Sequence, residues 1–312
     1  MREMDTYHLC LAWNCEYDSD FASLFAEACF SKGLSLLQVT PGNLADVLDS
    51  LSHQRLKFQV IIDRASDQDS GYVPLAQWAI TYCTYFINPY HKARRAWNKA
   101  EMHFSLIRAG LQTPLTIILP SYQEQPFLVL INLGMLAQPF TIKPAHGCGG
   151  EGVITEASGF DQVLAVRQEY PADQYLLQAN IVPRELGSHS AWFRVVYCTG
   201  EVYLCWWDRS THIYTPVSSE EELTFGLFPL RDAAMTIANL TGLDLFSTEI
   251  AYTAEGLFVV VDYVNDMPDL RLQSKAADGI PDDIAIDVTR RLVMLAIEHC
   301  KPPDANTHGF AP

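Results

Sequence analysis

The sequence predicts a mixed α/β fold whose character changes about a third of the way along the chain. Over roughly the first 90 residues, short apolar runs alternate with helix-like segments, which is typical of a parallel sheet with helices on its faces. Farther along, strand-like runs occur in pairs joined by Gly-containing turns, which is typical of antiparallel hairpins. The fold class is therefore α/β in the N-terminal part and α+β in the C-terminal part.

The N-terminal part contains strand-like runs that are rich in β-branched and aromatic residues. These predicted strands cover residues 7–13, 34–40, 58–65 and 84–89. Helices are predicted between them, over 18–33, 43–52 and around 77–83. The first helix begins at an Asp or Ser cap and ends at Gly33, in line with the preferences of helix termini. A cation-rich segment over 88–114 then contains one further helix that ends at Gly110.

The C-terminal part contains two predicted hairpins. One has its turn at Thr199-Gly200 and the other near Glu255-Gly256, and Gly-containing pairs of this kind favour two-residue turns. Two more strand-like runs, PFTIKP and GVITEAS, flank a glycine-rich stretch. Helices are predicted around 159–169, 227–240 and 282–300.

The bulk composition excludes several classes of function. The chain has 312 residues, of which 49% are hydrophobic and 19% charged, as expected for two or three globular domains. Its formal net charge of −16 argues against nucleic acid as a partner, because contact with phosphate backbones requires a basic surface. No apolar run reaches transmembrane length, and the N-terminus lacks a signal-peptide core. The eight cysteines include no CxxC pair and are expected to be reduced thiols, so we expect a soluble, cytoplasmic protein that binds no membrane.

A glycine-rich stretch, FTIKPAHGCGGEGV, is the most informative motif in the sequence. It runs from Phe140 to Val153, and after a single lysine, Lys143, come the glycines Gly147, Gly149, Gly150 and Gly152. Glycines allow backbone N–H groups to approach phosphate oxygens closely, and a lysine on the preceding strand adds a positive charge. The stretch therefore predicts a flexible flap that closes over a triphosphate. The alternative is a hairpin tip whose glycines serve only for turning.

Three other glycine-rich motifs do not fit the context of this stretch. Gly147, Gly149 and Gly152 match G-x-G-x-x-G, but a dinucleotide site needs a helix directly after the loop, and the strand-like VITEAS follows here. No Walker sequence G-x-x-x-x-G-K-[ST] occurs in the chain. A protein-kinase loop would carry its lysine downstream and require HRD and DFG motifs, and neither tripeptide is present.

Taken together, IKPAHGCGGEGV and the segment FINPYHKARRAWNKAEMHFSLIRAGLQTPLTIIL resemble sequences of the ATP-grasp superfamily, carboxylate–amine ligase type. In that superfamily a strand that ends in Lys-Pro precedes the phosphate-binding glycine loop. The resemblance covers most of the chain beyond about residue 85. It implies a Rossmann-like pre-ATP-grasp domain over residues 1–90, followed by a two-lobed ATP-grasp fold. The N-terminal lobe, with the glycine loop, would cover 91–178, and the C-terminal lobe, with a metal-binding hairpin, would cover 179–312.

The resemblance also implies how nucleotide phosphates would be bound. Lys99 and Lys143 match the two lysines that reach the phosphates, together with the four glycines of the flap. Within the flap, Cys148 has no identifiable basic partner and is expected to be a small loop residue. His146 is expected either to contact phosphate or to lie exposed.

The segment LLQANI resembles the connection between the lobes that presents backbone groups to adenine. This resemblance implies nucleotide-binding roles for Gln178, Asn180 and Ile181. Ala179 stands where the family often has an acid. We therefore expect the ribose to be bound by a carboxylate from elsewhere, and Glu185 is the candidate.

Three arginines match positions that act on the transferred phosphoryl group or on the substrates. Arg194 and Arg209 would offset negative charge on the phosphoryl group and the acylphosphate, for which a guanidinium is well suited. The alternative for Arg209 is an ion pair with the neighbouring Asp208. Arg271, assisted by Lys275, would bind a carboxylate of the acceptor substrate.

The resemblance implies a magnesium site on the last predicted hairpin, with an acid on one strand and Glu-x-Asn on the next. The expected ligands are Glu249, Asp262 and Asn265, and Tyr263 stands at the position of the family's Glu, which leaves the number of metals open. A two-residue turn at Glu255-Gly256 places Glu249 directly opposite Asp262, with Cβ atoms about 4.5–5.5 Å apart. Such a pair favours a cation such as Mg²⁺ between the carboxylates, and the alternative is an exposed pair without a metal. Asn265 falls on the opposite face of a regular strand and joins the pair only if the strand bends.

The implied function is the ATP-dependent joining of a carboxylate to an amine through an acylphosphate, with ATP and Mg²⁺ as cofactors. The substrates would be small molecules or peptides, and no nucleic acid is expected. One alternative is a sensor or carrier that binds nucleotide without turnover. Another is a ligase that modifies peptides or proteins, for which the aromatic segment CWWDRSTHIY would line a groove. The sequence leaves the oligomeric state open, with a homodimer as one option.

Overall fold

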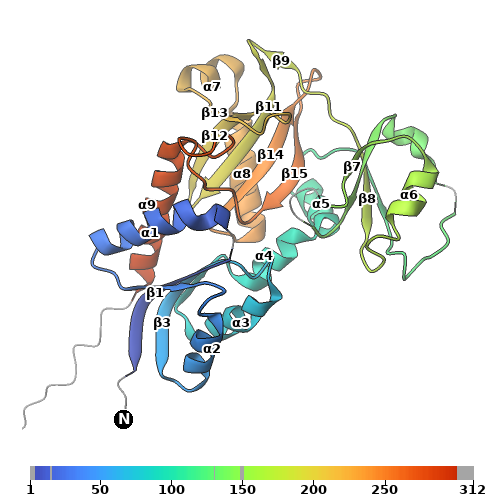
Figure 1. The fold of residues 1–312 in the computed structure, drawn as a ribbon. Helices are drawn as coiled ribbons and strands as arrows, with labels where there is room; N and C mark the ends of the chain where they lie inside the picture. Colours follow the sequence, from blue (N-terminus) through green and yellow to red (C-terminus); the bar gives the residue numbers. More distant parts are fainter. Residues whose placement is uncertain (1–3, 15, 130, 148–150, 301–312) are drawn as a thin grey trace, which may run out of the picture. The chain divides into compact units, whose positions relative to one another are not determined.

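The protein has a mixed α/β architecture divided into two compact units (Figure 1). The computed structural model describes residues 4–14, 16–129, 131–147 and 151–300. The first unit is drawn from residues 1–90 and 269–312, and the second from residues 91–268. Within the described residues, no helix is both long and apolar enough to span a membrane.

The first unit is built on a parallel sheet, as the sequence predicts. The strand order is β2-β1-β3-β4, and every pairing is parallel. The strands are β1 (Asp5–Trp13), β2 (Leu36–Val39), β3 (Leu56–Arg64) and β4 (Tyr85–Ile87). The helices are α1 (Ser19–Ser31), α2 (Leu44–Ser52), α3 (Val73–Tyr82) and α9 (Asp282–His299), with short 3₁₀ turns η1 (Glu16–Asp18) and η2 (Ser70–Tyr72). Cys10 and Ala12 of β1 pack with buried residues of α2 and α3, which form one core of this unit.

Helix α9 explains why the C-terminal segment belongs to the first unit. We expected residues 179–312 to form one lobe, but the segment from Asp269 onward groups with the N-terminal residues. Helix α9 packs against α1 and β3. Its last residue, His299, stacks on Tyr85 with 3.7 Å between the ring centroids, and its carbonyl accepts a hydrogen bond from the Thr84 hydroxyl at 2.8 Å. The C-terminal helix therefore completes the N-terminal unit.

The second unit contains two antiparallel sheets and a two-stranded ribbon. The first sheet, in the order β5-β8-β6-β7, consists of β5 (Thr116–Leu119), β6 (Phe140–Pro144), β7 (Ile154–Ala157) and β8 (Tyr175–Ala179). The second sheet, in the order β13-β12-β11-β14-β15, consists of β11 (Trp192–Cys198), β12 (Glu201–Trp207), β13 (Tyr214–Pro216), β14 (Leu245–Tyr252) and β15 (Phe258–Asn265). The ribbon consists of β9 (Glu185–Leu186) and β10 (His189–Ser190).

Helices cover both sheets of the second unit. They are α4 (Tyr90–Trp97), α5 (Lys99–Arg108), α6 (Phe160–Val166), α7 (Ser219–Phe225) and α8 (Phe228–Thr241), with a 3₁₀ turn η3 (Leu133–Leu136). Helix α8 packs on β11, β12 and β15 and shares a core with α5. Helix α6 packs on the first sheet, in a separate core that includes β5, β6 and β8.

The cation-rich segment after β4 forms two helices rather than the single helix that the sequence predicts. Asn98 lies between them in an extended conformation, with φ −74° and ψ 96°. Its side chain accepts hydrogen bonds from the N–H groups of Ala100 and Glu101, so it caps the second helix. Because of this cap, Lys99 is the first residue of α5, and its position is fixed at a helix start.

The two predicted hairpins are present, and their turns differ in length. The turn between β11 and β12 is the predicted two-residue turn, with positive φ at Thr199 and Gly200 (46° and 90°). The loop between β14 and β15 is one residue longer than predicted. The Thr253 N–H donates to the Leu257 carbonyl at 2.9 Å, which closes a three-residue loop with Gly256 at φ 83°.

Candidate active site

Several of the predicted site residues lie on one face of the second sheet. Arg194 of β11 pairs directly with Glu249 of β14, and Glu249 pairs directly with Asp262 of β15. Directly paired residues point to the same face of a sheet. Trp192 shares this face because it lies two residues from Arg194 on the same strand. The face therefore carries a row of one basic and two acidic side chains across three neighbouring strands.

The pairing of Glu249 with Asp262 is as predicted, although the three-residue loop alone would not produce it. After that loop, Ile250 pairs with Val260. Val261 is then an extra residue on β15, and this β-bulge shifts the register by one so that Asp262 comes opposite Glu249.

A second irregularity brings Asn265 to the same face. Ser247 pairs with Asn265, and Glu249 pairs with Asp262. The two partners are three residues apart on β15 but only two apart on β14, so β15 contains one extra residue in this interval. Ser247 and Glu249 are two residues apart and share a face, and their partners therefore share it as well. We expected Asn265 to join the acids only if the strand departed from regularity, and the extra residue is that departure.

Lys143 reaches this hairpin from the other sheet. It lies near the end of β6, is 7% exposed, and its Nζ donates a hydrogen bond to the Val261 carbonyl at 3.2 Å. Burial lowers the pKa of Lys143 to about 8. The carboxylates of Asp262 and Glu249 raise this pKa, and the positive charge of Lys99 lowers it further. The lysine and the two acids are therefore near enough to influence one another.

Asp262 is held in its ionised form by its basic neighbours. Burial alone would raise the pKa of Asp262, but the positive charges of Lys143, Lys99 and Arg194 outweigh it and lower the pKa below its ordinary value. The side chain of Asn265 accepts a hydrogen bond from the Met267 N–H at 3.1 Å, which orients its amide.

Glu249 is fixed by two N–H donors. Its Oε1 forms an ion pair with the Arg194 guanidinium at 2.8 Å, and its Oε2 accepts a hydrogen bond from the Trp192 indole N–H at 3.0 Å. Both side chains of the ion pair are largely buried, at 14% exposed for Arg194 and 16% for Glu249. One carboxylate oxygen therefore faces a cation and the other a neutral donor.

Arg194 and Arg209 each stack on a tryptophan of the other strand of the β11–β12 hairpin. The sequence repeats Trp-x-Arg, as Trp192 and Arg194 on β11 and as Trp207 and Arg209 at the end of β12. The Arg194 guanidinium lies 4.6 Å from the centre of the Trp207 ring, and the Arg209 guanidinium lies 4.2 Å from that of Trp192. Each arginine is therefore positioned by the tryptophan of the neighbouring strand.

The alternative reading of Arg209, an ion pair with Asp208, is not what the structure shows. The Asp208 carboxylate accepts hydrogen bonds from the Ser210 N–H and hydroxyl and from the Thr211 N–H. Within the described part of the chain, no carboxylate forms an ion pair with Arg209, so its charge is available to a ligand.

The oxygen atoms of Asp262, Glu249 and Asn265 fit a magnesium–nucleotide complex. Mg²⁺ is usually held by one or two carboxylates together with phosphates of the substrate. The N–H partners of Glu249 leave lone pairs on both of its carboxylate oxygens. Among the described residues, no group of three or more His, Cys, Asp and Glu side chains could hold a metal alone. The donor set therefore suits a metal that is shared with a bound phosphate.

Tyr263 points away from this face and takes part in a buried hydrogen-bond network. It is 1% exposed, and its hydroxyl accepts a hydrogen bond from Gln178 Nε2 at 2.7 Å and lies 2.7 Å from His103 Nδ1. Its ring centre is 5.1 Å from Lys143 Nζ. Burial, with the charge of Lys143, lowers the pKa of His103. Tyr263 thus packs its ring against the Lys143 ammonium group, while the neighbouring Asp262 lies on the face that carries Glu249.

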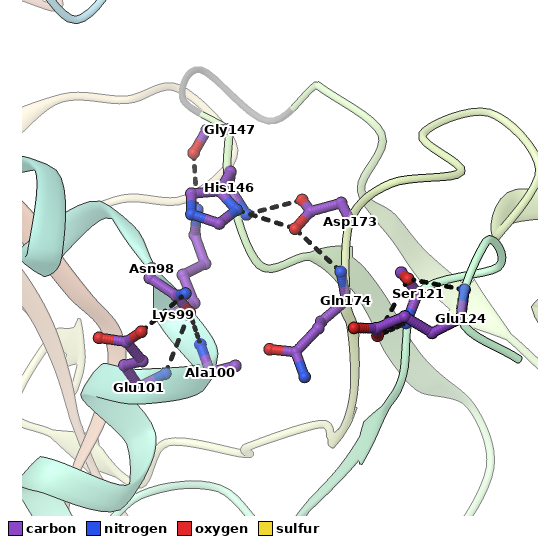
Figure 2. Close-up of polar contacts among 10 residues, drawn as sticks. All are labelled: Asn98, Lys99, Ala100, Glu101, Ser121, Glu124, His146, Gly147, Asp173 and Gln174. Carbon is purple, nitrogen blue, oxygen red and sulfur yellow. Dashed lines mark hydrogen bonds and ion pairs between the residues drawn. The ribbon is translucent and has the colours of Figure 1, made fainter.

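Polar contacts hold the entry to the glycine loop in place (Figure 2). Lys99 Nζ donates to the Gly147 carbonyl at 2.6 Å. The Lys99 N–H donates to the Ala145 carbonyl at 2.8 Å. His146 is bound to Asp173 twice, by its backbone N–H and by Nδ1, each at 2.8 Å. Lys99 and the start of the loop are therefore in direct contact, and His146 is tied to a carboxylate rather than free.

Of the four loop glycines, the structure describes Gly147 and Gly152. Gly149 and Gly150, with Cys148, lie outside the described residues. Gly147 and Gly152 have φ of +135° and +68°, a region that favours glycine. A Cβ atom on Gly152 would lie 2.8 Å from the Tyr170 ring.

The predicted adenine-binding segment begins within β8 and extends two residues past its end, and the side chains of Gln178 and Asn180 already form hydrogen bonds. Gln178 Nε2 also donates to the Thr116 hydroxyl at 3.0 Å. Asn180 accepts from the Thr141 hydroxyl at 2.6 Å. Ile181 follows the strand, and Glu185 is exposed on the β9–β10 ribbon. Adenine binding by this backbone and ribose binding by Glu185 stay predictions.

Arg271 belongs to the first unit, whereas the residues above belong to the second. Its guanidinium pairs with Asp269 at 2.6 Å and with Asp278 at 2.9 Å, and the hydrogen bonds that it donates to Asp269 raise its pKa. Lys275 pairs with Asp20 at 2.6 Å in the same unit. Their role toward a substrate stays a prediction.

Sequence reasoning missed the two tryptophans and the buried network. The repeated Trp-x-Arg pattern was visible in the sequence, and the predicted hairpin register would have placed Trp192 opposite Trp207. No sequence signal indicated that His103 and Gln178 meet at Tyr263, because those residues lie on three separate elements.

Comparisons with known proteins agree with the observed architecture. No protein-family model matches the chain, and no curated protein matches it. It is similar to the structure of a RimK domain ATP-grasp protein from Sphaerobacter thermophilus, with 18% identity and a TM-score of 0.65 over 92% of this chain and 99% of that one.

Two further structures are similar at low identity. D-alanine–D-alanine ligase from Bacillus anthracis, complexed with ATP, has 13% identity and a TM-score of 0.62 over 94% of this chain and 96% of that one. Macrocyclase MdnC from Microcystis aeruginosa, bound with precursor peptide MdnA, has 10% identity and a TM-score of 0.61 over 92% of this chain and 99% of that one. The chain therefore has the fold of the ATP-grasp superfamily, as the resemblance in its sequence implies.

Proposed function

We propose that this protein is an ATP-dependent ligase that activates a carboxylate as an acylphosphate, releases ADP, and joins the acyl group to an amine. One observation carries the proposal. Lys143 contacts β15 beside Asp262, in a sheet that also carries Glu249 on β14 and Arg194 on β11, on the same face as Asp262. A buried lysine, two carboxylates and a guanidinium at one place suit a metal-bound polyphosphate, because they supply partners for both the metal and the phosphates.

In the first step, a carboxylate oxygen of the substrate bonds to the γ-phosphorus of ATP while the bond to the β–γ bridging oxygen breaks. ADP leaves, and the acid becomes an acylphosphate. Lys143 and Lys99 would bind the phosphates, and Arg194 and Arg209 would offset negative charge on the transferred group. In the second step, the amine nitrogen attacks the acyl carbon, phosphate leaves, and the nitrogen loses a proton. Neither step requires a side-chain nucleophile.

Asp262, Asn265 and Glu249 would hold Mg²⁺, which would supply positive charge that offsets the negative charge of the nucleotide phosphates. The chain's own residues orient these oxygens and keep the Asp262 carboxylate ionised. Arg194 and Trp192 orient the carboxylate of Glu249, and Lys143 and Arg194 favour the ionised form of Asp262.

Purified protein incubated with ATP, Mg²⁺ and pools of amino acids or short peptides tests the proposal. We expect ADP and phosphate to form only when a suitable pair of substrates is present. Lys143→Met should abolish this release while the far-UV circular dichroism stays unchanged. A matched control is Lys32→Met, which removes a solvent-exposed lysine that follows α1 in the first unit.

Three outcomes would contradict the proposal. AMP with pyrophosphate in place of ADP would indicate adenylation. Nucleotide binding without turnover on any pool would indicate a sensor or carrier. ADP release that survives Lys143→Met would contradict the assignment of the nucleotide site.

A further inference from the structure

A cavity of about 530 Å³ lies next to the two arginine–tryptophan pairs in the second unit. Its lining comes from the β9–β10 ribbon, from Trp192 on β11, from the end of β12, and from the loop between β12 and β13. Ligand pockets in proteins commonly enclose roughly 300–1,000 Å³. This cavity is therefore large enough for an amino acid or the end of a short peptide.

The cavity offers one cation to a ligand. Arg209 lines it, and within the described residues no carboxylate pairs with that guanidinium. The nearest acid in the sequence, Asp208, also lines the cavity, but its Oδ1 accepts hydrogen bonds from Ser210 at 2.6 and 2.8 Å. These contacts turn the Asp208 carboxylate toward its own loop. An anionic group is therefore favoured at Arg209, in spite of the protein's net charge of −16.

The walls of the cavity favour a flat or apolar group beside that anion. Three tryptophans are among the lining residues, Trp192, Trp206 and Trp207. Trp206 is kept in place by stacking on His189, with 4.7 Å between ring centroids, and Trp207 by stacking on His212, at 5.5 Å. Rings that are already packed lose little freedom when a ligand binds, so they form a preorganised surface.

Two residues link the cavity to the candidate active site, Trp192 and Arg209. Trp192 lines the cavity and donates its indole N–H to Glu249. Arg209 lines the cavity and lies over the Trp192 ring. A carboxylate bound by Arg209 would therefore lie at the edge of the Arg194–Glu249–Asp262 row, where phosphoryl transfer is proposed.

We infer that this cavity binds the carboxylate substrate of the ligation, and that this substrate is an α-carboxylate next to an aromatic or bulky apolar side chain. The inference rests on the proposed function and names its substrate class. Arg209 binds the carboxylate, and the indole rings contact the side chain. A free amino acid and the C-terminal residue of a short peptide share this chemistry.

Binding without nucleotide separates this inference from the ligase proposal. Calorimetric titrations would use L-phenylalanine, the dipeptide Gly-L-Phe, glycine, and L-phenylalaninamide, which lacks the carboxylate. We expect L-phenylalanine or Gly-L-Phe to bind, and glycine and the amide to bind at least about tenfold more weakly, because each lacks one of the two recognised groups. Preference for the free amino acid over the dipeptide, or the reverse, identifies the source of the carboxylate.

Two variants test the residues. Arg209→Gln should weaken the binding of the preferred probe at least about tenfold, since a charge-assisted hydrogen bond is lost. Ser190→Trp, at an exposed position on β10 that lines the cavity, should block binding while Arg209 is kept. Arg290→Gln is the matched control, because it removes an arginine of the first unit whose side chain is 60% exposed, and binding should not change.

The inference is overturned if neither carboxylate probe binds the wild-type protein, if the amide binds as well as the acid, or if Arg209→Gln and Ser190→Trp leave binding unchanged. ADP release with a carboxylate that does not compete for the cavity would overturn it and leave the ligase proposal standing. Binding as expected, without ADP release on any amine pool, would support the cavity assignment and contradict the ligase proposal.

Discussion

The indole N–H of Trp192 donates a hydrogen bond to Oε2 of Glu249 at 3.0 Å, while the face of the same ring lies 4.2 Å from the Arg209 guanidinium. One side chain thus orients both a proposed metal ligand and a proposed phosphoryl-binding arginine. Substitutions at this position can separate the two roles, because a phenyl ring keeps the aromatic face and loses the N–H group.

Trp192→Phe should raise the Mg²⁺ concentration needed for half-maximal ADP formation by about 10–100-fold, as is usual when an outer partner of a metal ligand is lost. The rate at saturating Mg²⁺ should change little, because the ring under Arg209 remains. Trp13→Phe is the matched control, since it removes an indole N–H that donates to Gln38 at 3.1 Å in the first unit. An unchanged Mg²⁺ requirement in Trp192→Phe would show that this hydrogen bond does not support the metal site.

The neighbouring residues Asp262 and Tyr263 should respond in opposite ways. Asp262→Asn should reduce ADP formation by about 100-fold or more, since it removes a charged side chain that we propose as a metal ligand. Tyr263→Phe should leave the rate at saturating ATP within about threefold. It should lower the free energy of unfolding by about 1–3 kcal/mol, because two buried polar partners, His103 and Gln178, lose the hydroxyl. Urea denaturation and steady-state kinetics of both variants measure these effects. Loss of turnover in Tyr263→Phe with normal stability would place its hydroxyl in the chemistry instead.

Nucleotide affinity should depend on pH through Lys143. Burial lowers the pKa of Lys143 to about 8, so the free protein loses this proton as the pH rises through that value. Bound phosphate favours the charged lysine, so the dissociation constant for metal-free AMP-PNP should increase by up to about tenfold per pH unit above pH 8. Binding in that range should take up a proton, which titrations in buffers of different ionisation enthalpy detect.

Lys143→Arg is the control, because a guanidinium stays charged throughout this range and should abolish the pH dependence.

The free protein should show the matching effect on stability. A charged Lys143 is disfavoured in the folded state relative to the unfolded chain, so this group's destabilisation is complete below pH 8. It is relieved between about pH 8 and the ordinary lysine pKa of about 10.4. A flat affinity profile in the wild-type protein would rule out Lys143 as the phosphate-binding group.

Gly152→Ala should impair nucleotide binding through the conformation of the loop. The residue has φ +68°, which costs a non-glycine residue about 1–2 kcal/mol, and the new Cβ would meet the Tyr170 ring at 2.8 Å. We expect a several-fold higher KM for ATP and a slightly lower melting temperature. Gly159→Ala is the control, because its φ of −156° suits any residue and no atom lies within 4 Å of the added Cβ. Equal behaviour of the two variants would show that the loop adapts without cost.

Much of the fold follows from local sequence signals. The parallel strands of the first unit and the two hairpins of the second were predictable from apolar runs and turn residues. The break between α4 and α5 was signalled by Asn98 followed three residues later by Glu101, which is typical of a helix start. The prediction of a single helix did not take that signal into account. The return of α9 to the first unit depends on packing with α1 and β3, which no local pattern records.

The candidate site could be predicted only in part for a similar reason. The pairing of Glu249 with Asp262 was predicted from a two-residue turn, whereas the molecule reaches it through a longer loop and a bulge at Val261. A bulge among similar apolar residues has no sequence signature, because its position depends on contacts with other elements. Here the extra residue offers its carbonyl to Lys143.

The second irregularity of β15, between Asp262 and Asn265, bears on how related hairpins should be compared. In this chain the acid and the amide are separated by two intervening positions, Tyr263 and Val264, instead of the single one in Glu-x-Asn. A sequence pattern with fixed spacing would miss Asp262 and Asn265, although both side chains lie on the same face of the β14–β15 hairpin. Alignments of such sites are better anchored on the direction in which side chains project than on a count of residues.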